Sequence, residues 1–312
     1  MNVKVAVVGG GNVGANTALY IAERGLADVT LIDIVDGMPQ GKALDLTQAA
    51  PLWHSAARVE GSNSLDDVKG SSVVVITAGF PRKPGMSRSD LLKANADIVG
   101  PAAEAVKQHA ANATVIVVTN PLDVMAYVAW RKTGFPRQRV LGMAGVLDST
   151  RFRAFVAMEM GVAAPDVQAM VLGGHGDSMV PLPRYTTVGG IPITELLSKE
   201  RIDALSQRTR DGGAEIVKLL KTGSAYYAPA MSAVEMVQAI LRDEKRVIPC
   251  SVLLNGEYGM KDLFLGVPVV VGAGGVERVI ELGLTADEQT ALAASGKGVR
   301  EMIEELALDA VA

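Results

Sequence analysis

The first half of the chain alternates short apolar runs with longer stretches in which polar and apolar residues are mixed. The short runs are rich in β-branched residues and apolar at successive positions; they read VKVAVVG, DVTLIDI, SSVVVITAG, ATVIVVTN and RVLGM. Strands with this pattern are covered on both faces, as in parallel sheets whose strands are joined by helices. We therefore predict an α/β fold built on a doubly wound parallel sheet.

The pattern changes past about Gly145. Helical segments then dominate, and two adjacent strand candidates, VIPCSVLL and GVPVVVGAGGVERVIEL, indicate antiparallel pairing. The length of 312 residues is about twice the roughly 150 residues expected of one domain. We predict two domains, residues 1–145 with the parallel sheet and residues 146–312 with an α+β arrangement.

A glycine motif follows the first apolar run. Gly9, Gly11 and Gly14 form the pattern G-x-G-x-x-G between a predicted strand and a predicted helix, and Asp33 ends the next strand. The glycines permit a tight turn, approach of a pyrophosphate and close helix packing, while the helix N-terminus supplies free N–H groups. A carboxylate at Asp33 accepts hydrogen bonds from ribose hydroxyls and repels a 2′-phosphate. The first domain is thus predicted to be a Rossmann-type domain that binds NAD in preference to NADP.

The overall composition narrows the possible partners and location. A formal net charge of −4 gives no electrostatic reason to expect nucleic acid or an anionic membrane as partner. Cys250 is the only cysteine, which suits a reducing compartment. The opening MNVKVAVVGG lacks the features of a signal peptide, and the apolar runs are shorter than the roughly 18 to 20 residues that span a bilayer. We expect a cytoplasmic protein.

A basic loop, AGFPRKPGMSRSD, follows one of the buried runs and precedes a predicted helix. It carries Arg82, Lys83 and Arg88 among prolines and Gly85. Its position places it at the carboxyl edge of the sheet, where ligands bind. Its residues suit either a solvated basic loop or a lid whose cations close on an anionic substrate and exclude water.

Further polar residues are predicted at the same edge. Asn120 follows a strand in VIVVTNPLDV, and Asp148 and Arg151 lie three apart on the first turn of a predicted helix. Asp148 alternatively caps that helix, and Arg151 alternatively forms an intrahelical ion pair. His175, one of three histidines, stands in the glycine-rich VLGGHGDSMV, where it could cap a turn, bind a metal or move protons. Polar groups converging beside a dinucleotide site favour an enzyme.

Six segments together resemble the lactate/malate dehydrogenase family, and within it the malate dehydrogenases of lactate-dehydrogenase-like type, over essentially the full length. They are GGGNVG, LIDI, TAGFPRKPGMSRSDLL, TNPLDV, AGVLDSTRFR and VLGGHGDSMVPL. The combination is far more specific than the glycine motif alone. The resemblance implies an enzyme that interconverts malate and oxaloacetate with NAD, a reaction of the tricarboxylic acid cycle.

The resemblance also implies a role for each polar residue. His175 matches the residue that moves the proton, for which imidazole has a suitable pKa, and Asp148 the carboxylate that orients its ring. Arg151 matches the residue that grips the substrate's C1 carboxylate. Arg88 matches the one that polarises the carbonyl, and Asn120 an amide near the substrate and the nicotinamide ribose.

The same resemblance implies the cofactor site, the partners and the assembly. The residues matched to NAD binding are Gly9, Gly11, Asn12, Val13, Gly14, Asp33, Thr77, Ala78, Gly79, Asn95, Thr119 and Asn120. No metal site is expected. The implied partners are the small-molecule substrate and further copies of the chain, as a dimer or a tetramer.

Arg82 distinguishes the expected activities. At this position lactate dehydrogenases typically carry Gln, whereas malate dehydrogenases carry Arg, which pairs with the second carboxylate of a C4 acid. A lactate or other 2-hydroxy acid dehydrogenase is the nearest alternative. An NAD-dependent glycosidase, which typically uses Cys, His and a divalent metal, and a binding protein derived from a dehydrogenase are more distant ones.

Replacing Arg82 with Gln tests this assignment. The change removes a charge-assisted pair with oxaloacetate, so its kcat/KM should fall by at least about a hundredfold, whereas that for pyruvate should rise because no cation is left unpaired. A merely solvated Arg82 predicts changes below roughly fivefold for both substrates. Steady-state kinetics on both substrates decide between the two, and an unchanged ratio of the two kcat/KM values contradicts the assignment.

Overall fold

A parallel sheet forms the first part of the fold. The computed structural model describes residues 3–80 and 87–306. Within them the first part consists of β1 (Lys4–Val8), α1 (Asn12–Glu23), β2 (Asp28–Ile32), α2 (Met38–Ala49), β3 (Val59–Ser62), β4 (Val73–Ile76), α3 (Arg88–His109), β5 (Thr114–Val117), α4 (Leu122–Thr133) and β6 (Val140–Gly142). The strands pair in parallel in the order β3-β2-β1-β4-β5-β6. The predicted doubly wound Rossmann-type sheet is confirmed.

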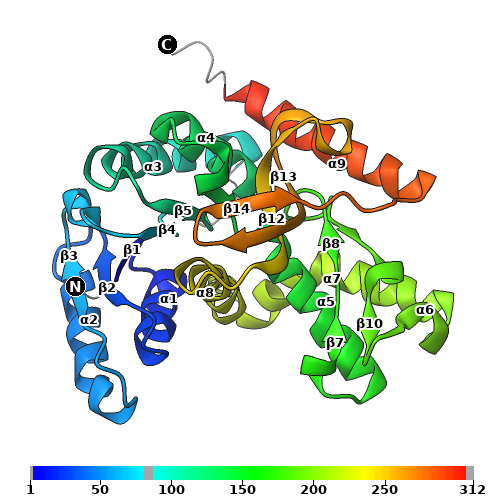
Figure 1. Cartoon of the computed structure of the whole chain (residues 1–312), viewed down its shortest axis with the longest axis horizontal. Helices are drawn as coiled ribbons and strands as arrows, with labels where there is room; N and C mark the ends of the chain where they lie inside the picture. Colours follow the sequence, from blue (N-terminus) through cyan, green and yellow to red (C-terminus); the bar gives the residue numbers. More distant parts are fainter. Residues whose placement is uncertain (1–2, 81–86, 307–312) are drawn as a thin grey trace.

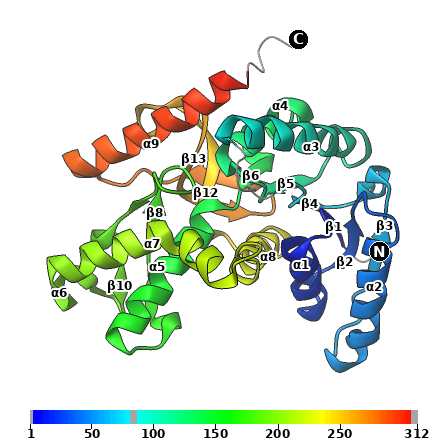
Figure 2. The same ribbon diagram turned by 180° about the vertical axis from the view of Figure 1, so that it is seen from behind.

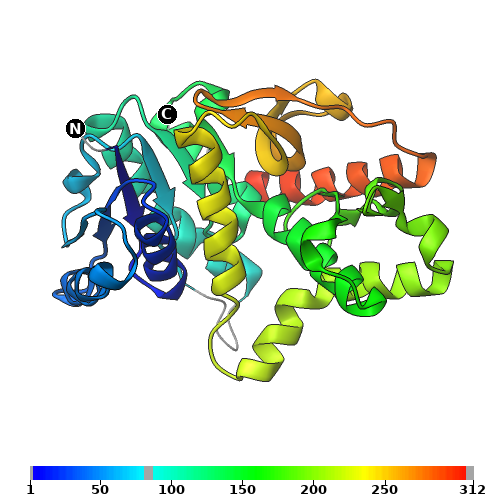
Figure 3. The ribbon, with the colours of Figure 1, turned by 60° about the horizontal axis from the view of Figure 1, so that its bottom comes forward.

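The second part contains most of the remaining helices and short strands. Its elements are α5 (Ala144–Met160), β7 (Val167–Gln168), β8 (Val171–Leu172), β9 (Val180–Pro181), β10 (Thr187–Val188), β11 (Ile191–Pro192), α6 (Ile193–Leu196), α7 (Lys199–Leu220), α8 (Tyr227–Leu241), β12 (Arg246–Asn255), β13 (Lys261–Gly272), β14 (Gly275–Val279) and α9 (Ala286–Glu305). Figures 1 and 2 show α3 and α4 on one side of the sheet and α1 and α8 on the other. Helix α5 packs against α7 and β12 (Figure 3).

The antiparallel strands of the second part extend the sheet of the first. β13 pairs antiparallel with β12 and with β14, so the second of the two predicted strand segments forms two strands. β12 also pairs with β6 through Ser251 and Gly142. A continuous nine-stranded sheet results among the described residues. The pairing covers the backbone groups that β6 would otherwise expose at the edge of the parallel sheet. The two parts therefore share one sheet.

Helix α5 begins earlier than the sequence predicts. It starts at Ala144, so Asp148 is its fifth residue and not a member of its first turn. Its second residue is Gly145, where a methyl group would lie 2.8 Å from Cβ of Pro249 on β12. The glycine permits close packing of helix and strand. The predicted boundary between residues 145 and 146 consequently falls inside the helix.

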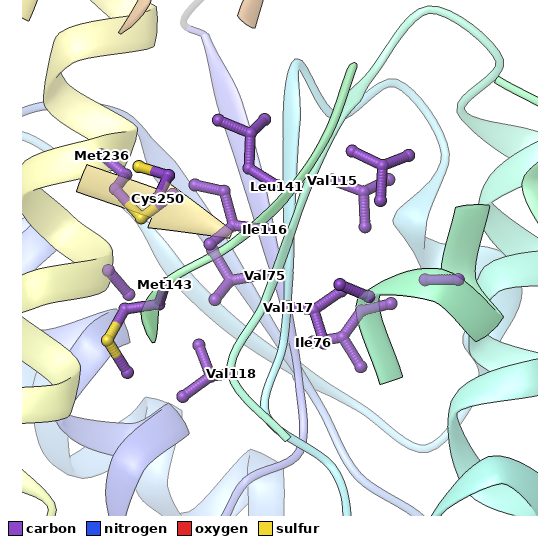
Figure 4. Close-up of a cluster of buried hydrophobic side chains, with 14 of the residues drawn as sticks. Val75, Ile76, Val115, Ile116, Val117, Val118, Leu141, Met143, Met236 and Cys250 are labelled. Atoms are coloured by element: carbon purple, nitrogen blue, oxygen red, sulfur yellow. The ribbon is translucent and has the colours of Figure 1, made fainter. Parts of the chain in front are cut away.

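The centre of the sheet is held by a closely packed apolar cluster (Figure 4). Val75, Val115 and Ile116 from the parallel strands, with Leu141 of β6, have no exposed surface. Figure 4 shows Met236 of α8 beside the strands. Dense packing of this kind resists displacement, so the strand ends that carry polar residues are held in place.

No helix in the described part of the chain is long and apolar enough to cross a membrane.

Candidate active site

The turn between β1 and α1 has the shape of a phosphate cradle. A methyl group on Gly9 (φ +108°) would lie 2.5 Å from the Ala78 nitrogen, and one on Gly14 would lie 1.8 Å from the Gly9 oxygen. Around Gly11, by contrast, no described atom lies within 4 Å of such a methyl group, and no side chain caps the helix that starts at Asn12. The free N–H groups of α1 thus face space that a pyrophosphate can enter. This arrangement fits NAD.

The carboxylate of Asp33 is oriented by backbone groups. Its Oδ2 accepts a hydrogen bond from the Gly10 N–H at 2.6 Å and its Oδ1 accepts one from the Val35 N–H at 3.0 Å. Each oxygen has further lone pairs for ribose hydroxyls. Lys42 of α2 donates to the Gly10 carbonyl at 2.6 Å. Lys42 was not predicted, because nothing in the sequence pattern of α2 indicates that it reaches the turn.

The segments after β4 and β5 are tied to each other and to the glycine turn. Thr77 donates to the Gly9 carbonyl at 3.0 Å, and Thr119 donates to the Ala78 carbonyl at 2.7 Å. Gly79 also lies against Thr119, where a methyl group would be 2.5 Å from Cγ2. The segment after β4 lies beside the end of β1, and the helices that follow these two strands, α3 and α1, lie on opposite faces of the sheet. This is the usual place for a ligand in such folds.

Asn95 is used within the protein. Its side chain is fully buried, accepts a hydrogen bond from the Phe80 N–H at 2.7 Å and donates to the carbonyls of Phe80 and Asn120 at 3.1 and 2.6 Å. It therefore holds the start of the basic loop against the turn after β5. Direct contact of Asn95 with the cofactor remains a prediction. Asn120 is exposed, and Val13 lies half-buried in the first turn of α1.

His175 and Asp148 are in contact, as the resemblance to the dehydrogenase family implies. His175 Nδ1 lies 2.9 Å from Asp148 Oδ2 and donates to it, since an ionised carboxylate only accepts. Both side chains are largely buried. Burial alone lowers the pKa of His175, but the charge and hydrogen bond of Asp148 outweigh that effect, so the pKa lies above its ordinary value. The imidazolium is thus favoured.

Arg151 lies on the same face of α5. Its Nη1 is 3.4 Å from Asp148 Oδ1, so the alternative of an intrahelical ion pair is present. That ion pair does not use all the hydrogen-bond donors of the guanidinium, because the Nε–H group is buried without an acceptor among the described residues. Burial lowers the pKa of Arg151, against the charge of Asp148. A buried cation with an unpaired N–H is suited to an anionic ligand.

Gly212, near the middle of α7, leaves space for Arg151. A methyl group there would lie 3.3 Å from Arg151 Cδ and 3.7 Å from Nε, so the arginine would have to shift by a few tenths of an ångström. Glycine within a helix costs about 1 kcal/mol relative to alanine. In the sequence, the signal for this space is the pair of adjacent glycines, Gly212 and Gly213, inside a helical pattern.

The basic loop is only partly described. Arg88 is the first residue of α3, exposed, and without a hydrogen-bond or ion-pair partner in the described chain. Ser87 and Asp90 cap that helix reciprocally, and their hydrogen bonds lower the pKa of Asp90. The predictions for Arg82 and Lys83, and for a lid, concern residues 81–86, which lie outside the described residues. Among the described contacts, none joins Arg88 or the Asn120 side chain to His175.

Cys250 does not resemble a catalytic thiol. It lies on β12 beside Met143 and Met236 in the apolar cluster (Figure 4), and burial raises the pKa of its thiol. Its neighbour Ser251 contacts the buried Asp123 near His175, so β12 runs closer to the histidine than the sequence suggests. Adjacent strand residues point to opposite faces of a sheet, so the Cys250 thiol lies on the face away from Asp123.

Among the described residues, no three His, Cys, Asp or Glu side chains form a possible metal site.

Comparisons with known proteins cover nearly the whole chain. The sequence model described as "lactate/malate dehydrogenase, NAD binding domain" matches residues 3–142, and that of the "lactate/malate dehydrogenase, alpha/beta C-terminal domain" matches residues 145–308. Malate dehydrogenases of Thermomicrobium roseum and Roseiflexus sp. (strain RS-1) are 57% and 54% identical. The first match covers 97% of this chain and 98% of the relative, the second 98% and 99%.

Solved structures agree in shape. Malate dehydrogenase of Cryptosporidium parvum has a TM-score of 0.96 and 46% identity, covering 98% of this chain and 99% of that one. Lactate dehydrogenase of the same organism, complexed with lactic acid and nicotinamide adenine dinucleotide, has a TM-score of 0.95 and 46% identity over 98% of both chains. Similarity of fold therefore does not by itself distinguish the two substrates.

Gly212→Ala tests the space made for Arg151. Because the added methyl group displaces the guanidinium, KM for the expected substrate oxaloacetate should rise about fivefold or more, with a smaller change in kcat. Gly298→Ala in α9 is the matched control, since it also replaces a glycine inside a helix but adds a methyl group to open space. Equal KM values for the two variants in steady-state assays would show that Gly212 does not position Arg151.

Proposed function

The chain belongs to the lactate/malate dehydrogenase family, and from its site we propose that it is an NAD-dependent malate dehydrogenase. The observation that carries this proposal is the sharing of Asp148 between His175 and Arg151. A group that can move a proton and a buried cation with an unpaired N–H stand beside the same carboxylate. A 2-hydroxy acid requires both, one at its hydroxyl and one at its carboxylate.

His175 is the proposed proton donor and acceptor. Because Nδ1 is bound to Asp148, the proton is exchanged at Nε2, which has no hydrogen-bond partner in the described part of the chain. In malate oxidation Nε2 takes the hydroxyl proton; in oxaloacetate reduction it returns a proton to the carbonyl oxygen. Asp148 holds the ring in the required tautomer and stabilises the imidazolium.

The other proposed residues bind and orient the reactants. Arg151 pairs with the C1 carboxylate, and Arg88 stabilises negative charge that develops on the carbonyl oxygen. Asn120 orients the substrate beside the nicotinamide ribose. The glycine turn and Asp33 would hold the pyrophosphate and the ribose of NAD, respectively. Bound NAD supplies the acceptor or donor of the hydride.

Sequence supports the choice of malate over lactate. The two sequence relatives given above are named malate dehydrogenases, and Arg82 is the residue expected to pair with a second carboxylate. We further propose that the boundary between the two domains lies near residues 145 and 146. We also propose that the protein is cytoplasmic and acts in the tricarboxylic acid cycle. Finally, we propose that it forms a homo-oligomer. Exposed Leu44 and Leu52, on and just after α2, support an interface with a second copy.

The activity is tested by NADH oxidation with oxaloacetate and with pyruvate, measured side by side. We expect kcat/KM for oxaloacetate to exceed that for pyruvate by at least about a hundredfold, because a pocket with an unpaired cation penalises the monocarboxylate. Repeating the oxaloacetate assay with NADPH checks the coenzyme. Comparable values for the two 2-oxo acids, or a preference for pyruvate, would contradict the proposal.

His175→Asn tests the proton-transfer role. Asn cannot exchange a proton near neutral pH, so kcat should fall by about three powers of ten or more, whereas NADH binding should change little because its proposed contacts lie in the first part of the chain. The dissociation constant for NADH, followed by fluorescence, serves as the control for folding. A variant that keeps more than roughly a tenth of wild-type turnover would refute the role.

A further inference from the structure

The backbone of the His175 loop is held from three directions. Three successive N–H groups each donate to a different element; the pairs are Gly173 to the Gly266 carbonyl of β13, Gly174 to Ser295 Oγ of α9, and His175 to Asp123 Oδ2 of α4, all at 2.8 Å. Of these three acceptors, only the one bound to His175 is a carboxylate. Asp123 was not identified from the sequence.

Asp123 is almost completely buried, with 3% of its surface exposed. Its Oδ1 accepts a hydrogen bond from Ser251 Oγ at 2.6 Å, while Oδ2 accepts the one from His175. It stands three residues after Asn120, so the start of α4 links the proposed nicotinamide side of the site to the histidine. No salt bridge joins Asp123 to a lysine or arginine within the described residues.

Burial of this carboxylate is costly without a compensating partner. Both of its hydrogen-bond donors, a backbone N–H and a hydroxyl, are neutral, and a neutral amide side chain would be able to accept the bond from His175 equally well. The titratable groups that act on Asp123 are the imidazole of His175, whose ring Asp148 contacts, and Asp148 itself. A carboxylate at this position is therefore explained by its charge as well as by its shape.

We propose that Asp123 is a positioning residue for the reaction, which fixes the backbone of His175 and, as a second buried carboxylate, favours the imidazolium. This inference rests on the proposed function only where it concerns catalysis. The effect on His175 itself is a property of the free protein.

Three described charges act on the imidazole. Asp148 and Arg151 of α5 have opposite effects, and Asp123 of α4 adds to that of Asp148. Burial of His175 lowers its pKa, and the two carboxylates raise it against the effect of Arg151. Burial in turn raises the pKa of Asp123, against the hydrogen bonds from Ser251 and His175 that favour its ionised form.

The test is an NMR titration of the imidazole groups in the wild type and in Asp123→Asn. The chain has only three histidines, so replacing His54 and His109 one at a time assigns the signals. The amide oxygen of Asn can accept from the His175 N–H while its NH₂ group donates to Ser251 Oγ. The shape of the side chain and the bond from the His175 N–H are thus kept, the bond with Ser251 is reversed in direction, and the charge is lost.

We expect the pKa of His175 to fall by about half a unit or more in Asp123→Asn, and further in Asp148→Asn, whose carboxylate contacts the ring. Asp97→Asn, which removes an exposed charge on α3, should leave it unchanged. A His175 pKa equal in the wild type and in Asp123→Asn overturns the proposal. If Asp123→Asn does not fold, Ser251→Ala decides instead: loss of the hydroxyl disfavours the ionised carboxylate and should lower the His175 pKa, and no change overturns the proposal.

The pH dependence of turnover gives an independent readout. Oxaloacetate reduction needs protonated His175, so kcat/KM is retained at low pH and lost as pH rises through its pKa; malate oxidation needs the neutral ring and shows the reverse. In Asp123→Asn both midpoints should move to lower pH, while NADH affinity stays the same. Midpoints that do not move contradict the catalytic part. Lack of activity in the wild type would refute the proposed function without affecting the NMR result.

Discussion

The pairing of β12 with β6 determines where the functional side chains meet. Ser251 on β12 lies opposite Gly142 on β6, and its hydroxyl reaches Asp123 at the start of α4. Asp123 in turn holds the backbone of His175. A single antiparallel contact between the two parts of the chain thus aligns the end of the parallel sheet with the histidine loop. Together with the packing of α8 against α1 and of α4 against β13, it fixes the dinucleotide turn relative to the proton-transfer group.

Charge is closely balanced in this interior. Two buried carboxylates, Asp123 and Asp148, stand near one guanidinium, that of Arg151, and one imidazole. With His175 neutral and both carboxylates ionised, the group carries one net negative charge; with His175 protonated it carries none. Because uncompensated charge is costly in a poorly hydrated site, the protein interior favours the form of His175 that can donate a proton. A substrate carboxylate at Arg151 would strengthen that preference.

Sequence periodicity predicted the strands and the doubly wound parallel sheet, because these depend on local pattern. The contact of His175 with Asp148 was implied by the resemblance to the dehydrogenase family and not by periodicity. The predicted start of α5 was wrong: Asp148 was placed in the first turn, whereas the helix begins at Ala144, with Gly145 packed against Pro249. Lys42 and Asp123 escaped notice for a related reason. Their roles arise only when segments far apart in the chain meet, and a single sequence carries little record of such meetings.

The glycines around His175 have a physical explanation in the same contacts. A methyl group on Gly174 would lie 3.1 Å from Cγ2 of Val299 on α9 and 3.4 Å from Asp123 Oδ2. A side chain there would press on both the helix and the carboxylate that hold the loop. The backbone can approach α9, β13 and α4 together only because its residues before the histidine lack side chains. His175 is thereby buried deeply enough for Asp123 and Asp148 to set its charge, while Nε2 is left for the substrate.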